Sequence, residues 1–175
     1  AVSITAMIIT LAFVNGFQEK VADKIFGFWG HIRVQKYETG KSLISEELPL
    51  TKNAAVENNM ASTPGVISYQ SFATKSAVLE SQNDIEGVLI KGIEKNENHS
   101  ALKQFLVAGR WIQFTDSLYS KETLVSDAVA KALQIKINDT IKVHFVATNS
   151  DAQKTYRKLV VVGFYHTGID EYDKL

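Results

Sequence analysis

The chain has 175 residues, and its 19 basic side chains balance 19 acidic ones, giving a formal net charge of +0 at pH 7. This balance excludes a general nucleic-acid binder, because such a protein needs a basic surface to meet the phosphates. The chain contains no cysteine, which excludes disulfides, thiol catalysis and thiolate metal sites.

Residues 1–18 contain no charged side chain, and Glu19 is the first charge. A bilayer core of roughly 30 Å needs about 20 apolar residues in a helix, so the run has nearly the length of a transmembrane span. A buried core helix and a signal-peptide remnant are the alternatives. Because the chain opens inside this run without an initiator Met, we expect a fragment that begins within a membrane helix.

Apolar residues recur at helical spacing from Phe17 to Phe28, so the helix is predicted to continue and to end near Gly27 or Gly30. Aromatic residues precede that end, namely Phe26, Phe28 and Trp29. They suit a membrane–water interface, and packing on the following domain is the alternative. Residues 31–37 then alternate with period two, which predicts a strand.

Pro49 suits the first turn of a helix that runs through residues 51–62 and ends at Pro64. Residues 66–79 are rich in β-formers, and a shift in their alternation predicts a bulge near residues 72–74. Residues 85–93 are expected to return as the second arm of a hairpin.

Glu94 opens a seven-residue stretch without an apolar side chain, which predicts a lobe boundary. Ser126 is suited to cap a helix whose inner face holds Val129, Ala130 and Leu133, and Asn138 tolerates a left-handed turn. The other expected elements are a helix over 101–107, a turn at 109–111, a strand over 122–125, and strands over 140–146 and 158–164 that flank a polar tip.

No constellation for catalysis is present in the sequence. The four histidines, His31, His99, His144 and His166, lie on separate predicted elements without an HExxH-type pair, and no Gly-x-Ser-x-Gly elbow exists. The acidic group Asp170, Glu171 and Asp173 is expected to form an exposed loop rather than an acid–base pair or a cation site. We therefore predict a protein that is not an enzyme and has no metal or cofactor.

Four motifs follow one another along the chain. They are Gly16-Phe17-Gln18 with Lys24, Gly27-Phe28 and His31-Ile32; Gly109-Arg110-Trp111; Leu124–Leu133 with Asp139-Thr140; and Thr167–Asp173. In this order and spacing they resemble the first span and extracytoplasmic entry of lipoprotein-releasing ABC permeases of the LolC/LolE type, within the MacB/FtsX-like permease superfamily.

The resemblance implies an α+β fold, the MacB-like periplasmic core domain, in which a porter-like α+β lobe carries an inserted, mostly β lobe behind a transmembrane helix. Residues 1–30 would be the end of that helix and a juxtamembrane amphipathic helix. Residues 31–94 would begin the porter-like lobe, residues 95–165 would form the inserted lobe, and residues 166–175 would return to the porter-like lobe.

The resemblance also implies a function. A permease subunit in the bacterial inner membrane, with this domain in the periplasm, couples ATP hydrolysis by a cytoplasmic ATPase to the release of lipoproteins from the membrane. The implied partners are that ATPase, a second permease subunit, the lipoprotein substrate, membrane lipid and a periplasmic lipoprotein chaperone. The rival hypothesis is a soluble or membrane-anchored interaction domain without a transport role.

Two groups of residues are candidates for binding. The resemblance places an acyl-chain cavity at the outer end of the first span, where the apolar residues are Leu11, Phe13, Val14, Phe17 and Val21; packing against neighbouring spans or lipid is the alternative. The polar tip offers Lys154, Tyr156 and Arg157 for a partner contact, against an ordinary solvated hairpin. The tip lacks the Pro-rich hook of LolC-like subunits, so the chaperone contact and the subtype stay open.

Overall fold

The structure is a computed structural model that describes residues 2–37, 48–81, 84–95, 97–115, 120–146 and 156–173. The chain divides into two compact units, the first ending at Val34 and the second beginning at Gln35.

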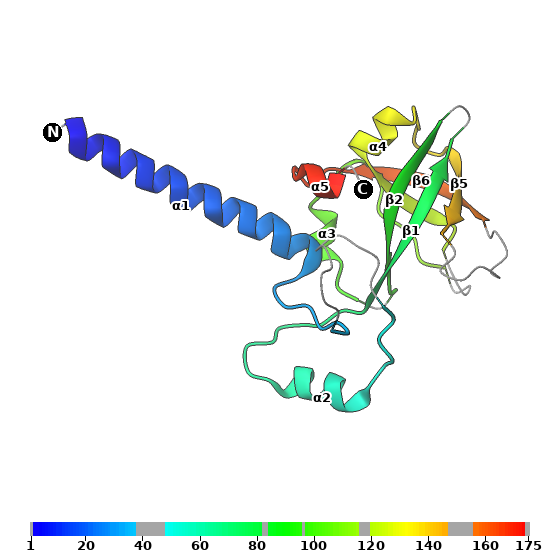
Figure 1. Cartoon of the computed structure of the whole chain (residues 1–175), viewed down its shortest axis with the longest axis horizontal. Coiled ribbons are helices and arrows are strands. Elements are labelled where there is room, and N and C mark those ends of the chain that lie inside the picture. Colours follow the sequence, from blue (N-terminus) through cyan, green and yellow to red (C-terminus); the bar gives the residue numbers. More distant parts are fainter. Residues whose placement is uncertain are drawn as a thin grey trace. The chain divides into compact units, whose positions relative to one another are not determined.

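The first unit is built on one helix, α1 (Val2–Trp29), which runs without interruption through Gly16 (Figure 1). Its 28 residues extend about 42 Å at 1.5 Å per residue. The helix ends where predicted, because Gly30 adopts a positive φ of 87° and its N–H donates to the Phe26 carbonyl at 2.8 Å.

Residues 31–37 do not form the strand that their alternation predicts. A strand needs a hydrogen-bonding neighbour, and no described residue pairs with this segment. Its side chains contact the end of α1 instead. The His31 ring stacks on Phe26 with centroids 4.5 Å apart, and the Arg33 guanidinium lies 4.5 Å from the Trp29 ring centre. Ile32 and Tyr37 are exposed, so the alternation here does not mark a buried face of a sheet.

The second unit begins with a short helix, α2 (Ala54–Ser62), which starts later than Pro49 or Thr51. Asn53 sets this start, because its side chain accepts a hydrogen bond from the Ala55 N–H at 2.9 Å. The helix ends before Pro64, as predicted.

Strands β1 (Phe72–Glu80) and β2 (Ile85–Ile93) form the predicted antiparallel hairpin (Figure 1). Their register is continuous from Phe72 opposite Ile93 to Glu80 opposite Ile85, so the predicted bulge is wrong. The alternation shifts because β1 buries residues on both faces. Thr74 is buried on one face, and Ala77 and Leu79 are buried on the other.

The remaining elements follow in chain order. They are α3 (Ser100–Lys103), β3 (Leu106–Gly109), β4 (Glu122–Ser126), α4 (Asp127–Ala132), β5 (Thr140–Phe145), β6 (Tyr156–Tyr165) and α5 (Asp170–Asp173). The helix predicted over 101–107 is shorter than expected, because Leu106 and its successors pair with β6 instead.

These strands form a six-stranded sheet in the order β2-β1-β5-β6-β3, with β4 beside β6. All pairs are antiparallel except β4 with β6. Because β1 pairs with β5, the sheet runs across the lobe boundary expected at Glu94. The assignment of residues to a porter-like and an inserted lobe stays a prediction.

The core lies where α4 packs on the sheet. The predicted inner face of α4, with Val129, Ala130 and Leu133, is buried against Val143 and Val161. Ser126 caps α4 as predicted, accepting the Val129 N–H at 3.2 Å, and Asn138 takes a φ of 74° in the turn before β5. Helices on a mainly antiparallel sheet confirm the α+β fold class.

Candidate functional site

Helix α1 exposes the apolar residues predicted to line a substrate cavity. Leu11, Phe13, Val14 and Phe17 are exposed, Phe13 at 72 %, whereas Val21 is half-buried. Phe13 and Phe17 stack with ring centroids 6.3 Å apart, and 100° per residue places Val14, Phe17 and Val21 on one stripe. The structure brings these side chains to one side of the helix, and their contact with substrate stays a prediction.

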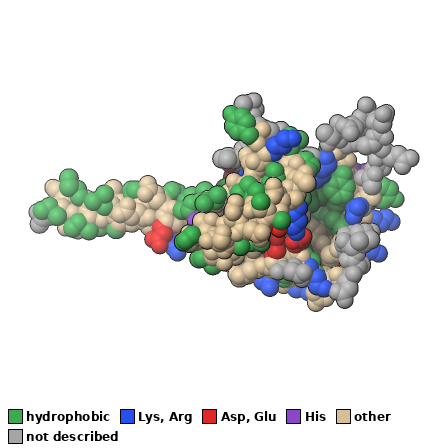
Figure 2. Space-filling model, turned by 90° about the horizontal axis from the view of Figure 1, so that it is seen from below, with side chains coloured by type: hydrophobic (Ala, Val, Ile, Leu, Met, Phe, Trp, Pro, Cys, Tyr) green, Lys and Arg blue, Asp and Glu red, His purple; other side chains and the backbone are tan. Residues whose placement is uncertain are grey.

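The helix as a whole has the surface of a membrane span. None of its residues is buried, which argues against the core-helix alternative, and hydrophobic side chains cover much of its length (Figure 2). Among the residues that the structure describes, α1 is the one helix long and apolar enough to cross a membrane by length and composition. A signal sequence near the N-terminus passes the same test.

The described residues include only part of the tip that is predicted to contact a partner. Lys154 lies outside the described residues, and Tyr156 and Arg157 are exposed at the start of β6, Tyr156 at 53 %. Consecutive strand residues point to opposite faces of a sheet, so Tyr156 and Arg157 do not share one face. The Tyr156 ring lies 5.7 Å from the ring of His144 opposite it. The role of the tip in binding a partner stays a prediction.

A charged cluster joins β1 to β5 on the surface. Lys142 Nζ donates a hydrogen bond to one carboxylate oxygen of Glu80 at 2.5 Å, and His144 Nε2 lies 2.6 Å from the other oxygen. The hydrogen bond from Lys142, and next the one from His144, holds the pKa of Glu80 below its usual value. Both partners come from β5, so the cluster links neighbouring strands of the sheet.

The turn at Gly109-Arg110-Trp111 has a defined structure. Gly109 has a φ of 80°, and the Arg110 N–H donates to the Val162 carbonyl at 3.0 Å. The two terminal nitrogens of Arg110 each donate a hydrogen bond to one carboxylate oxygen of Glu122, with Nη1 at 2.8 Å from Oε2. These hydrogen bonds lower the pKa of the Glu122 carboxyl. This motif therefore joins the end of β3 to the start of β4.

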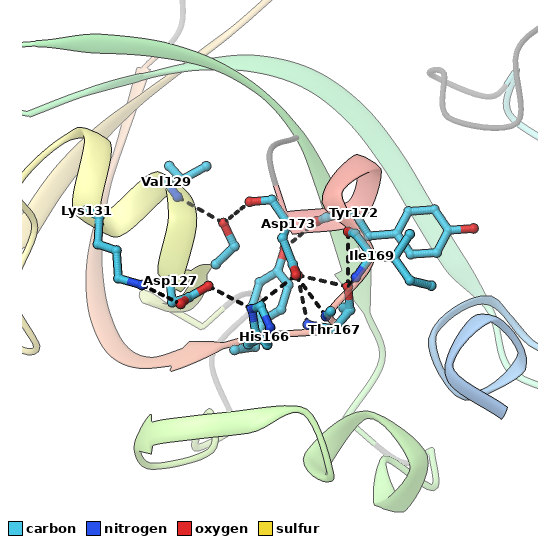
Figure 3. A network of polar contacts seen from close by, with 11 residues as sticks. Asp127, Val129, Lys131, His166, Thr167, Ile169, Tyr172 and Asp173 are labelled. Atoms are coloured by element: carbon cyan, nitrogen blue, oxygen red, sulfur yellow. Dashed lines mark hydrogen bonds and ion pairs between the residues drawn. The ribbon is translucent and has the colours of Figure 1, made fainter. Parts of the chain in front are cut away.

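A buried carboxylate organises the segment after β6 (Figure 3). Asp173 is only 4 % exposed. Its Oδ1 accepts the Thr167 N–H at 2.8 Å and hydroxyl at 2.9 Å, and its Oδ2 accepts the Gly168 N–H at 2.9 Å. The exposed loop predicted for residues 170–173 is wrong at Asp173, because these donors satisfy a carboxylate inside the fold.

The same segment is tied to helix α4. The Ser126 hydroxyl, which caps α4, also donates to the Asp173 carbonyl. His166 Nδ1 lies 3.0 Å from Asp127 Oδ1 and 3.2 Å from Asp173 Oδ2 (Figure 3). We call residues 126–127 together with 166–173 the exit junction, because it fixes the chain as it leaves the sheet.

The exit junction was not predicted from the sequence, although the sequence contained one indication of a bound carboxylate. Gly168 follows Thr167 and precedes an acidic stretch, and Gly168 adopts a φ of 73°. A threonine and a glycine ahead of an aspartate provide a hydroxyl and two N–H donors for one carboxylate. The histidines predicted to lie apart do come from separate elements. However, His144 and His166 each reach a carboxylate.

An exposed apolar helix of membrane-spanning length is followed along the chain by an α+β sheet domain. Residues 1–172 match the family described as the MacB-like periplasmic core domain, and the chain belongs to that family. This result confirms the resemblance found in the sequence.

Three curated relatives carry names of the lipoprotein-releasing system. The transmembrane protein LolC of Buchnera aphidicola is 28 % identical over 148 residues, covering 81 % of this chain and 32 % of that protein. LolC of Neisseria meningitidis is 20 % identical over 99 % of this chain and 40 % of its own length. LolE of Haemophilus influenzae is 22 % identical over 87 % of this chain and 35 % of its own length. The chain thus spans about a third to two fifths of these relatives.

Proposed function

We propose that this chain forms a first transmembrane helix and extracytoplasmic domain of a permease subunit in an ABC transporter that releases lipoproteins from the bacterial inner membrane. The observation that carries the proposal is α1, an unburied apolar helix within a chain of the MacB-like periplasmic core domain family. Relatives named as lipoprotein-releasing transmembrane proteins support the substrate class.

In this proposal the chain does no covalent chemistry. A cytoplasmic ATPase subunit hydrolyses ATP, a second permease subunit completes the membrane part, and the motion reaches the periplasmic domain through the spans. The rigid contacts of the exit junction suit such transmission, because hydrogen-bonded and well-packed elements move together.

The lipoprotein anchor is proposed to meet the stripe formed by Val14, Phe17 and Val21, with Leu11 and Phe13 at its margins. Each CH₂ of an acyl chain gains about 0.8 kcal/mol on burial in an apolar environment. An apolar wall therefore accepts an anchor from the bilayer without a polar recognition group. The tip around Tyr156 and Arg157 is the proposed contact for a periplasmic chaperone.

Photo-crosslinkers placed singly at Phe13, Phe17 and Val21 in the assembled transporter test the proposal. Ala12 is the matched control, because it is adjacent to Phe13 along the helix and faces the side opposite Val21. Capture of lipidated but not unlipidated substrate at these positions, and not at Ala12, supports the proposal. Labelling only of phospholipid and permease at all four positions contradicts the cavity and favours a span that packs against its neighbours.

A further inference from the structure

His166 Nδ1 faces two carboxylates that come from different elements. Asp127 belongs to α4 and Asp173 to α5, and they lie 3.0 Å and 3.2 Å from this nitrogen. An Nδ1 without a proton would present its lone pair to both carboxylate oxygens, so we assign the ring proton to Nδ1, from which it is donated toward both. The second ring nitrogen, Nε2, then decides whether the ring is charged.

The charged groups around the ring are mainly acidic. Helix α4 contributes Asp127 and also Lys131, whose Nζ contacts Asp127 Oδ2 at 2.8 Å, and α5 contributes Asp173. Two carboxylates and one ammonium leave a net charge of −1, which an imidazolium neutralises. The other acidic residues of α5, Asp170 and Glu171, are exposed, and they add negative charge to the same element.

Among the described residues, Tyr165 and Phe105 place neutral groups next to His166. On β6, Tyr165 precedes His166, and burial with a smaller contribution from Asp173 raises the pKa of its hydroxyl, which stays neutral. The His166 N–H donates to the Phe105 carbonyl at 2.9 Å. The His166 side chain is 51 % exposed, so solvent protons reach the ring.

We propose that His166 is a proton-operated latch of the exit junction, which holds α4 and α5 together more tightly when its imidazole ring is protonated. Histidine changes charge between about pH 5 and 8, so the latch tightens on the acid side of that range and relaxes above it. The state of the latch can be measured at two backbone amides next to His166, because the N–H groups of Thr167 and Gly168 both donate to Asp173.

Amide hydrogen exchange tests the latch. The protection factors of the Thr167 and Gly168 amides are measured by NMR at pH 5.5 and pH 7.5, on the whole chain in detergent micelles. The amide of Asn138, which donates to Val161 at 2.7 Å outside the junction, is the internal reference. We expect protection to be about two- to fivefold higher at pH 5.5, the size of a partly exposed ion pair, and to lose this gain in 0.5 M salt.

Three variants make the result decisive. His166→Gln keeps a donor without a titrating charge and should remove the pH dependence, whereas His166→Lys stays charged and should protect both amides equally at both pH values. His144→Gln is the matched control, because His144 contacts the Glu80 carboxylate on another part of the sheet, and it should behave as wild type. Equal protection of the wild type at both pH values, or an unchanged pH effect in His166→Gln, would overturn the proposal.

Discussion

The Asp173 carboxylate holds Thr167 through two hydrogen bonds, from the backbone N–H at 2.8 Å and from the hydroxyl at 2.9 Å, inside the fold. Replacing Asp173 with Asn turns one acceptor oxygen into a donor that faces other donors. Because a buried donor left unsatisfied costs about 1 to 3 kcal/mol, Asp173→Asn should lower the free energy of unfolding by about 2 kcal/mol in urea denaturation.

Glu171→Gln serves as the control for this variant, because Glu171 is exposed on the same short helix. A surface substitution of this kind changes the unfolding free energy by no more than about 0.5 kcal/mol. If Asp173→Asn proves as mild as Glu171→Gln, the buried carboxylate does not hold the exit junction.

The ion pair of Arg110 with Glu122 predicts a specific acid dependence. The hydrogen bond from Arg110 lowers the pKa of Glu122 below its ordinary 4.5 in the folded state, so the contribution of this pair is present above that value. It is lost as the pH falls through the lowered pKa, because the unfolded chain binds the proton more readily.

Glu122→Gln should therefore destabilise the chain by about 1 kcal/mol at pH 7, and the difference from wild type should shrink as the pH falls through the lowered pKa of Glu122. Unfolding free energies measured at several pH values give the comparison. A difference that stays constant from pH 7 to pH 3 would show that the carboxylate charge at Glu122 contributes nothing.

Gly109 is a position where only glycine fits. Its φ is 80°, and a Cβ at this residue would lie 2.4 Å from the Val162 carbonyl oxygen, so Gly109→Ala must displace the β3–β6 pairing. We expect a loss of about 2 kcal/mol or more in thermal unfolding. Gly87→Ala in β2 is the matched control, because nothing lies within 4 Å of its Cβ position, and it should retain wild-type stability.

No residue of α1 is buried. Removing residues 1–30 should therefore leave a monodisperse, folded domain in size-exclusion chromatography without detergent. By contrast, Leu133→Ala in the core should lower the unfolding free energy by about 2 to 5 kcal/mol. Aggregation of the shortened chain, with a full chain that is soluble without detergent, would return α1 to the role of a core helix.

Local signals predicted local structure well. The cap at Ser126, the left-handed turn at Asn138 and the end of α1 at Gly30 each depend on residues within one or two turns of the chain, and all were predicted correctly. The hairpin was also predicted, since its two arms are adjacent in sequence, although its first arm begins at Phe72 and not at Val66 as expected.

Long-range relationships were not predictable in the same way. The Asp173 carbonyl accepts a hydrogen bond from Ser126, 47 residues earlier, and no periodicity records that pairing. Residues 31–37 show the opposite error, because alternation predicts a strand without revealing whether a partner exists. The pairing of β1 with β5 likewise joins segments more than sixty residues apart, which composition near Glu94 does not reveal.

The central claim is that α1 anchors the chain in the inner membrane with its α+β domain in the periplasm. Alkaline carbonate extraction of cells that make the protein, combined with protease treatment of their spheroplasts, measures both parts of it. The account predicts a protein that stays in the membrane pellet and loses its domain to external protease. Release into the soluble fraction, whether uncleaved or shortened by removal of α1, or full protection from external protease, would contradict it.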